Sequence, residues 1–267
     1  IRSVVPDTPP AVTGRARLRV ALVPLHNFTL LPYAGFVDVL RLAADEGDHS
    51  RQRLCTWRLM SSAGAPVRAS CGTRVATDGG FTDPRAFDYI VLIGGLLHER
   101  QHMDADTEAF LRAADATGVP LVALCTAVFS LIRLGLMSGR QCCVSWYHFD
   151  DLRREFDDVT PIADRLFVAD GPRITCAGGT AAVDVAAWLV EQHVGAAEAQ
   201  KALHILLAEQ ARPAGAPQPR PVHECRPADV RLQRAIAFIE DNLAEPPSVD
   251  CVAATVGVSR RQLERLF

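Results

Sequence analysis

The stretch "LVALCTAVFSLIRLGL", residues 121–136, decides the fold class of this chain. A short apolar run ends at Cys125, and apolar residues at helical spacing follow at once, which predicts a buried strand joined directly to a helix. A cysteine at such a junction is either a nucleophile or the floor of a pocket that performs no chemistry. The rest of the sequence has to decide between these two roles.

Strands and helices alternate on both sides of this stretch. The predicted strands cover residues 17–25, 55–62, 87–95 and 120–124, with a hairpin of 165–170 and 173–179 turned at "DGPR". The predicted helices cover residues 34–45, 104–117, 180–194 and 197–210. This alternation indicates an α/β fold with a mainly parallel sheet covered by helices on both faces.

The loops at the carboxyl ends of parallel strands form the binding site in such sheets. The sequence therefore predicts one crevice at that edge, where His26 also falls. The predicted ligand-binding residues are Asn27, Phe28, Gly94, Gly95, Leu96, His98, Cys125, Ser145, Trp146 and Cys176. A plain loop position explains any one histidine better than ligand binding does, so the prediction depends on the convergence of the set.

The residues of this crevice indicate a class of ligand. Aromatic rings at Phe28 and Trp146 would attract a cation, and backbone amides at Gly94 and Gly95 would receive a carboxylate. A small zwitterion, such as an amino acid or a betaine-like metabolite, satisfies both features. The alternative is that the rings only pack in the core.

The overall composition excludes several classes of protein. The chain has 267 residues, of which 49% are hydrophobic and 22% charged, and its net charge of −3 gives no general attraction to nucleic acid. We expect no export signal and no membrane partner, because no apolar stretch approaches the ~20 residues of a membrane span. The eight cysteines form no C-x-x-C pair, so we expect reduced thiols in a cytoplasmic protein that holds no metal and no cofactor.

A proline-rich stretch divides the chain. Residues 211–227, "ARPAGAPQPRPVHECRP", hold five prolines and no apolar periodicity. Because proline fixes φ and lacks a backbone donor, this stretch predicts a semi-rigid linker. The predicted organisation is a sensor domain at 17–210, the linker at 211–227 and a small all-α domain at 228–267.

The segment after this stretch predicts a helix-turn-helix. Ser248 is a natural N-cap for a helix at 249–255, Gly257 supplies a left-handed turn, and Ser259 caps the next helix with Gln262 in capping-box position. Polar residues at the start of this last helix are the predicted DNA contacts, namely Ser259, Arg260, Arg261, Gln262 and Arg265. The alternative explanation is a solvated basic helix face.

Both halves resemble one family. "SVDCVAATVGVSRRQLERLF" resembles the first helix-turn-helix of AraC/XylS-type transcriptional regulators, with their pattern G-x-S-x-R-x-L-x-R-x-F. "FDYIVLIGG", "LCTAVFSLIRLGLMSGR" and "ITCAGGTAAVDVAAWLVEQHVG" resemble the PfpI-type, class I glutamine amidotransferase-like domain. This domain order is similar to that of GlxA-type regulators.

The resemblance implies a flavodoxin-like sandwich followed by a DNA-binding domain. It implies a homodimer that binds double-stranded DNA under the control of a small-molecule effector. AraC-type DNA-binding units contain two helix-turn-helices, and this sequence ends at Phe267 after the first. Residues 228–267 are therefore expected to be the first part of such a unit.

The resemblance also bears on Cys125. Enzymes of this superfamily pair the elbow cysteine with a histidine base and often with an acidic residue. Here Ser145 stands in the place of the histidine and Pro32 in the place of the acid, and His148 is expected to point elsewhere. We therefore predict a chain that is not an enzyme. The alternatives are a cysteine-dependent hydrolase or amidase, and a redox sensor that uses Cys125 or the adjacent Cys142 and Cys143.

Overall fold

The structure, a computed structural model, describes residues 16–46, 49–97, 103–219, 229–242 and 246–267. It divides into two compact units, Ile1–Gln218 and Pro219–Phe267, and each is described by itself. Within the described residues, no helix is both long enough and apolar enough to cross a membrane.

A six-stranded sheet lies at the centre of the described part of the first unit, in the order β2-β1-β5-β6-β10-β9. Neighbouring strands run parallel except for the antiparallel pair β10 and β9. The strands are β1 (Leu18–Pro24), β2 (Cys55–Leu59), β5 (Tyr89–Ile93), β6 (Leu121–Leu124), β9 (Phe167–Asp170) and β10 (Arg173–Cys176). Shorter pairs are β3 (Val67–Arg68) with β4 (Arg74–Val75), and β7 (Gln141–Cys143) with β8 (Thr160–Ile162).

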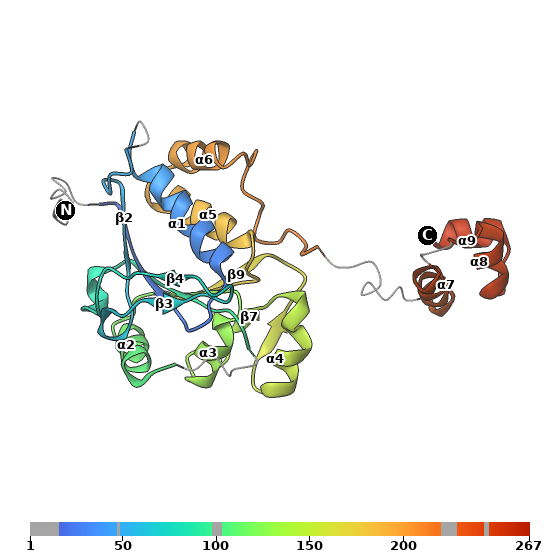
Figure 1. The fold of residues 1–267 in the computed structure, drawn as a ribbon, viewed down its shortest axis with the longest axis horizontal. Helices are drawn as coiled ribbons and strands as arrows, with labels where there is room; N and C mark the ends of the chain where they lie inside the picture. Colours follow the sequence, from blue (N-terminus) through green and yellow to red (C-terminus); the bar gives the residue numbers. More distant parts are fainter. Residues whose placement is uncertain (1–15, 47–48, 98–102, 220–228, 243–245) are drawn as a thin grey trace, which may run out of the picture. The chain divides into compact units, whose positions relative to one another are not determined.

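Helices cover both faces of this sheet (Figure 1). On one side lie α1 (Leu30–Ala44), α5 (Ala181–His193) and α6 (Ala196–Ile205), and on the other lie α2 (Ala105–Ala116), α3 (Ala127–Arg133) and α4 (Phe149–Glu155). Alternate residues of β1 face opposite sides, as the two-residue period of a strand requires. Val20 and Leu22 pack in the core of the α1 side, whereas Ala21 and Val23 pack in the core of the α2 side. The structure confirms the predicted α/β class.

Two predicted helix ends differ from the structure. The helix predicted at 34–45 begins earlier, at Leu30, because Pro32 lies in the first turn, where its missing donor costs no hydrogen bond. The helix predicted at 197–210 ends at Ile205, because Leu207 adopts the left-handed φ of +61° and the chain turns there.

The predicted linker also begins later in the structure. Residues 211–218 belong to the first unit, so the division falls after Gln218 and not before Ala211. Arg212 binds the buried carboxylate of Asp184 on α5, and the side chain of Gln218 is itself buried. A buried carboxylate requires a partner, and this pairing holds the proline-rich segment against α5.

The second unit contains three helices within its described residues: α7 (Val230–Asp241), α8 (Val249–Thr255) and α9 (Arg260–Leu266). Ala235, Val252, Ala253 and Leu263 form its buried core. Small residues at Ala235 and Ala253 allow the helices to approach closely.

The turn between α8 and α9 follows the sequence pattern. Gly257 adopts a φ of +72°, which a side chain would disfavour. The side chains of Ser248 and Ser259 cap α8 and α9, and Ser259 forms the predicted capping box with Gln262.

Candidate functional site

Cys125 occupies a sharp turn between β6 and α3. Its φ of +59° lies in the left-handed region, which costs a residue with a side chain about 1–2 kcal/mol. Thr126 is the N-cap residue of α3, so the turn has no room for a longer loop. A strained residue at the carboxyl edge of a parallel sheet marks this position as a candidate site.

The glycine pair opposite this turn allows close backbone approach. A Cβ on Gly94 would lie 2.2 Å from the amide nitrogen of Ala127, and one on Gly95 would lie 1.8 Å from the carbonyl oxygen of Asn27. The Gly94 amide already donates to the carbonyl of Leu124, and the Leu96 amide donates to that of Asn27. The Gly94 amide, predicted to bind a carboxylate, is therefore already used within the sheet. The lack of a side chain at Gly94 instead allows the backbone at Ala127 to pack against it.

The Cys125 thiol is held in its neutral form. Burial raises its pKa above the ordinary value, and this effect outweighs the opposing hydrogen bonds from Thr29 and Thr126. The Thr29 hydroxyl lies 3.8 Å from the Cys125 sulfur. Because the thiolate is the nucleophilic form, this environment does not activate the thiol.

A cavity of about 640 Å³ opens beside Cys125, and we call it the elbow cleft. One wall comes from loops at the edge of the sheet and the other from the segment that begins at Tyr147. Its lining residues are Thr29, Gly95, Leu96, Leu97, Cys125, Tyr147, His148, Asp151, Arg154 and Glu155.

His148 lines this cleft, contrary to the expectation that it would point elsewhere. It ends a 3-10 turn, η3 (Trp146–His148), and its Nδ1 lies 2.8 Å from Oδ2 of Asp151. The hydrogen bond from His148, together with Arg154, lowers the pKa of Asp151, so this carboxylate is ionised near neutral pH. An ionised carboxylate only accepts, so Nδ1 of His148 carries the hydrogen and donates it.

Several predicted lining residues have other roles. Phe28 is completely buried and makes an edge-to-face contact with Tyr33, because bridges to Ala69 and Gly95 draw its backbone into the core. It is a core residue and not part of an aromatic rim. Tyr147, which is 70% exposed, supplies the aromatic ring of the elbow cleft instead.

The remaining predictions fall into three groups. Ser145 caps η3 by accepting from the amide of Tyr147, and Trp146 packs partly against the core beside it. Asn27 and Cys176 are buried, and their polar atoms bind Arg68 and the Gly178 amide respectively. Of the predicted residues, Gly95, Leu96 and Cys125 line the cleft, and His98 lies outside the described residues.

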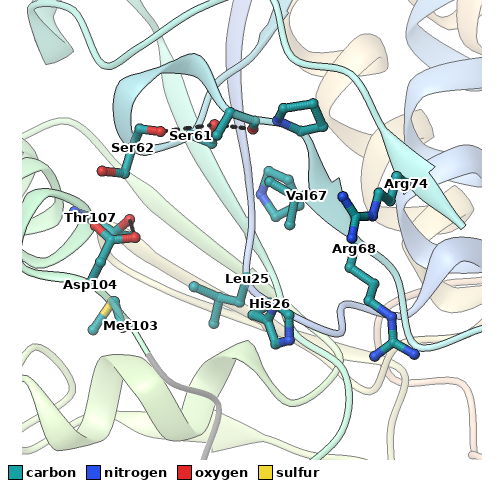
Figure 2. Close-up of a pocket in the computed structure, with 13 residues that line it drawn as sticks. Leu25, His26, Ser61, Ser62, Val67, Arg68, Arg74, Met103, Asp104 and Thr107 are labelled. Atoms are coloured by element: carbon teal, nitrogen blue, oxygen red, sulfur yellow. Dashed lines mark hydrogen bonds between the residues drawn. The ribbon is translucent and has the colours of Figure 1, made fainter. Parts of the chain in front are cut away.

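A second cavity, of about 350 Å³, lies at the carboxyl ends of β1 and β2. His26 lines this cavity together with Arg68 and Arg74, and Asp104 and Thr107 lie across from the two arginines (Figure 2). Both carboxylate oxygens of Asp104 already accept hydrogen bonds from Thr107, at 2.8 and 3.1 Å. The predicted crevice is thus divided into two cavities.

The start of α9 presents the predicted DNA contacts. Gln262 and Ser259 bond to each other in the capping box, and the Arg260 guanidinium pairs with Glu264 at 2.9 Å. Within the residues that the structure describes, Arg261 and Arg265 form no ion pair with an acidic side chain, and both are exposed. These two arginines are therefore the better candidates for contacts with phosphate or bases.

The part of the chain that the structure describes holds no cluster of three or more histidine, cysteine, aspartate or glutamate residues suited to a metal ion. The His148–Asp151 pair is too small a set of ligands for a tetrahedral site.

Comparison with known proteins gives the same two halves. The model of the DJ-1/PfpI family matches residues 19–192. The chain is 33% identical over 263 residues to the HTH-type transcriptional regulator GbdR of Pseudomonas aeruginosa, covering 98% of this chain and 70% of that protein. It is 27% identical over 258 residues to the HTH-type transcriptional regulator GlxA of Rhizobium meliloti, covering 93% and 76%.

A solved structure shows the same fold. The crystal structure of an AraC family transcriptional regulator from Pseudomonas putida matches with a TM-score of 0.58 at 21% identity, and the match covers 71% of this chain and 99% of that one.

Proposed function

This chain belongs to the DJ-1/PfpI family and is homologous over almost its whole length to HTH-type transcriptional regulators, and from this premise we propose that it is a regulator controlled by a small molecule. The predicted family resemblance and the predicted regulatory role are confirmed at that level. In the proposal, the elbow cleft binds the effector and the AraC-type helix-turn-helix binds double-stranded DNA. Action as a homodimer in the cytoplasm is part of the same proposal.

The position of Cys125 at the floor of an open cleft, where burial raises the pKa of its thiol, is the observation that carries this proposal. An enzyme of this fold needs a thiolate, whereas a sensor needs only a shaped and partly apolar floor. Burial of the sulfur favours the sensor.

The walls of the cleft favour a zwitterion. Tyr147 offers an aromatic face, and Asp151 and Glu155, which pair with Arg154 and Arg133, add carboxylates that favour an ammonium group. Arg154, in the same wall, is paired with Asp151 at the surface and would exchange this partner for the carboxylate of the ligand. These groups replace the predicted ones at Phe28 and Gly94, and the ligand class remains an amino acid or a betaine-like metabolite.

Calorimetric titration with a panel of amino acids, L-carnitine and glycine betaine tests the effector. We expect at least one member to bind, and Arg154→Ala to weaken that binding about tenfold, the effect of losing one charge-assisted hydrogen bond. Arg153→Ala is the matched control, since Arg153 packs over the Phe149 ring and does not line the cleft. Failure of every panel member to bind would contradict the ligand class.

A second candidate function follows from the position of His148. Asp151 orients its ring, and His148 and Cys125 line the same cleft, which supplies a candidate base and a candidate nucleophile for a cysteine hydrolase. We rank this candidate lower because burial raises the pKa of Cys125. Amidase turnover that disappears in both Cys125→Ala and His148→Ala would reverse the ranking.

A further inference from the structure

Gln218 is a buried polar side chain with three hydrogen bonds to separate backbone groups. Its Nε2 donates to the carbonyl oxygens of Val144, at 2.9 Å, and of Arg165, at 2.7 Å. Its Oε1 accepts from the amide of Trp146 at 2.8 Å. Both donors and the acceptor of the amide group are used, so the side chain has one well-defined position.

The Trp146 amide connects Gln218 to the elbow cleft. Trp146 is the first residue of η3, and the chain continues from η3 directly into α4. The next residues, Tyr147 and His148, line the cleft, and Asp151 on α4 lines it too. Gln218 therefore holds the first amide of the element that forms one whole wall of the cleft.

Gln218 is also the last residue of the first unit. Upstream of it, the amides of Leu166 and Phe167 donate to the carbonyl of Ala214, and Arg212 is bound to Asp184. The chain that follows leads to the helix-turn-helix. The same side chain thus lies at the end of the sensor unit and at the start of a cleft wall.

We propose that Gln218 is a positioning residue that couples occupancy of the elbow cleft to the segment leading to the helix-turn-helix. The inference rests on the proposed function, since it requires a ligand in this cleft. A ligand that moves η3 moves the Trp146 amide, and Gln218 then either follows it or loses a buried hydrogen bond. Both responses change the state of residues 211–218, and a ligand shifts that equilibrium by its differential affinity for the two states.

The first arm of the test needs no ligand. Hydrogen exchange is measured in the full chain for the peptides covering residues 146–155, in the wild type and in Gln218→Met, which keeps the length of the side chain and removes its hydrogen bonds. We expect exchange about tenfold faster in the variant, as expected when a buried hydrogen bond of η3 is lost. Arg212→Ala is the control, because it loosens the same segment at α5 and leaves the bonds to Trp146 and Val144 in place. Unchanged exchange in Gln218→Met would overturn the inference.

The second arm separates coupling from a merely structural role. Saturating ligand, taken from the panel of amino acids, L-carnitine and glycine betaine, should slow exchange of residues 211–218 in the wild type. Gln218→Met should bind the same ligand within about threefold of the wild-type affinity but lose this slowing, since coupling and affinity are separate quantities. An equal ligand response in the variant and the wild type would overturn the inference.

Two further outcomes remain decisive. If no panel member binds, the effector class of the proposed function fails, whereas the first arm still tests whether Gln218 positions η3. If Gln218→Met does not fold, Gln218→Glu replaces it, because it keeps the acceptor for the Trp146 amide and removes both donors. In the Glu variant, residues 146–155 should exchange at a rate close to that of the wild type, because the Trp146 amide keeps its acceptor. A rate far above that of the wild type would overturn the inference.

Discussion

Gly178 packs directly against Cys125. A Cβ on Gly178 would lie 2.7 Å from the Cβ and 3.1 Å from the sulfur of Cys125. Both residues have positive φ, +92° for Gly178 and +59° for Cys125. The strained turn at the floor of the elbow cleft is thus supported from the loop after β10, and the support requires a residue without a side chain.

Gly178→Ala should destabilise the sensor unit and displace Cys125. The added methyl group would overlap the cysteine and the backbone would be strained, so we expect a loss of about 2–4 kcal/mol in the free energy of unfolding, measured by urea denaturation. Gly179→Ala is the matched control, because Gly179 has a φ of +56° and no heavy atom within 4 Å of its would-be Cβ. That control should lose only about 1 kcal/mol, the cost of the left-handed backbone alone. Equal losses in the two variants would show that Gly178 does not support Cys125.

Cys71 should react with iodoacetamide faster than Cys125. Hydrogen bonding with Thr73 lowers the pKa of the exposed Cys71 thiol, whereas burial raises that of Cys125. Because the thiolate is the reactive form, we expect labelling of Cys71 to be more than about tenfold faster at pH 7.5, measured by peptide mass spectrometry. Thr73→Val should slow Cys71 and leave Cys125 unchanged. Preferential labelling of Cys125 would instead favour the hydrolase.

The sequence was sufficient to predict features that depend on neighbouring residues. β6 is a run of four buried apolar residues, and the strand-to-helix junction at Cys125 followed from it. The capping box of Ser259 and Gln262 is likewise a local pattern.

Features that depend on distant contacts could not be predicted in this way. The direction of His148 depends on η3, whose first amide is held by Gln218, 72 residues further along the chain. Phe28 is buried by bridges to Ala69 and Gly95, which no local pattern reveals. The pairing of Arg212 with Asp184, which moves the domain boundary, spans 28 residues. A pattern of proline residues shows that a segment is not a helix or strand, but not what it packs against.

Arg212→Ala should destabilise the sensor unit. It would leave the carboxylate of Asp184, a side chain only 5% exposed, without its cation. Because the Arg212 side chain is 42% exposed and water can partly replace it, we expect a loss of about 1–3 kcal/mol, less than for a fully buried pair. The double variant Arg212→Ala with Asp184→Ala should recover part of this loss in urea denaturation. The pairing would be contradicted if the double variant lost as much unfolding free energy as the two single variants together, or more.

Alkaline pH should destabilise the sensor unit through its buried thiols. Burial raises the pKa of Cys143 to about 12, above that of a thiol in the unfolded chain. A group with a raised pKa in the folded state stabilises the fold below the unfolded pKa, and this contribution is lost as the pH rises through the folded pKa. Stability should therefore fall between about pH 8.5, where unfolded thiols titrate, and about pH 12.

Thermal unfolding midpoints across this pH range test the prediction. Cys143→Ala should show a shallower decline than the wild type. Cys71→Ala serves as the control, since the exposed Cys71 thiol has a lowered pKa and cannot cause the decline. A decline of the same steepness in Cys143→Ala and the wild type would exclude Cys143 as a source.

Arg261 and Arg265 should contribute more to DNA binding than Arg260 does. The Arg260 guanidinium is already paired with Glu264 and Asp250, whereas Arg261 and Arg265 are exposed on α9 and form no ion pair with an acidic side chain among the described residues. An arginine that neutralises a phosphate releases a counterion from the DNA. Removing that arginine should therefore make the slope of log affinity against log salt concentration shallower by about one. Fluorescence anisotropy with a DNA duplex of mixed sequence, at several salt concentrations, measures this slope. Arg261→Ala and Arg265→Ala should each reduce it, and Arg260→Ala should change it less because its charge is already balanced. A larger reduction in Arg260→Ala would mean that the ion pair with Glu264 opens on DNA and that all three arginines form the contact surface.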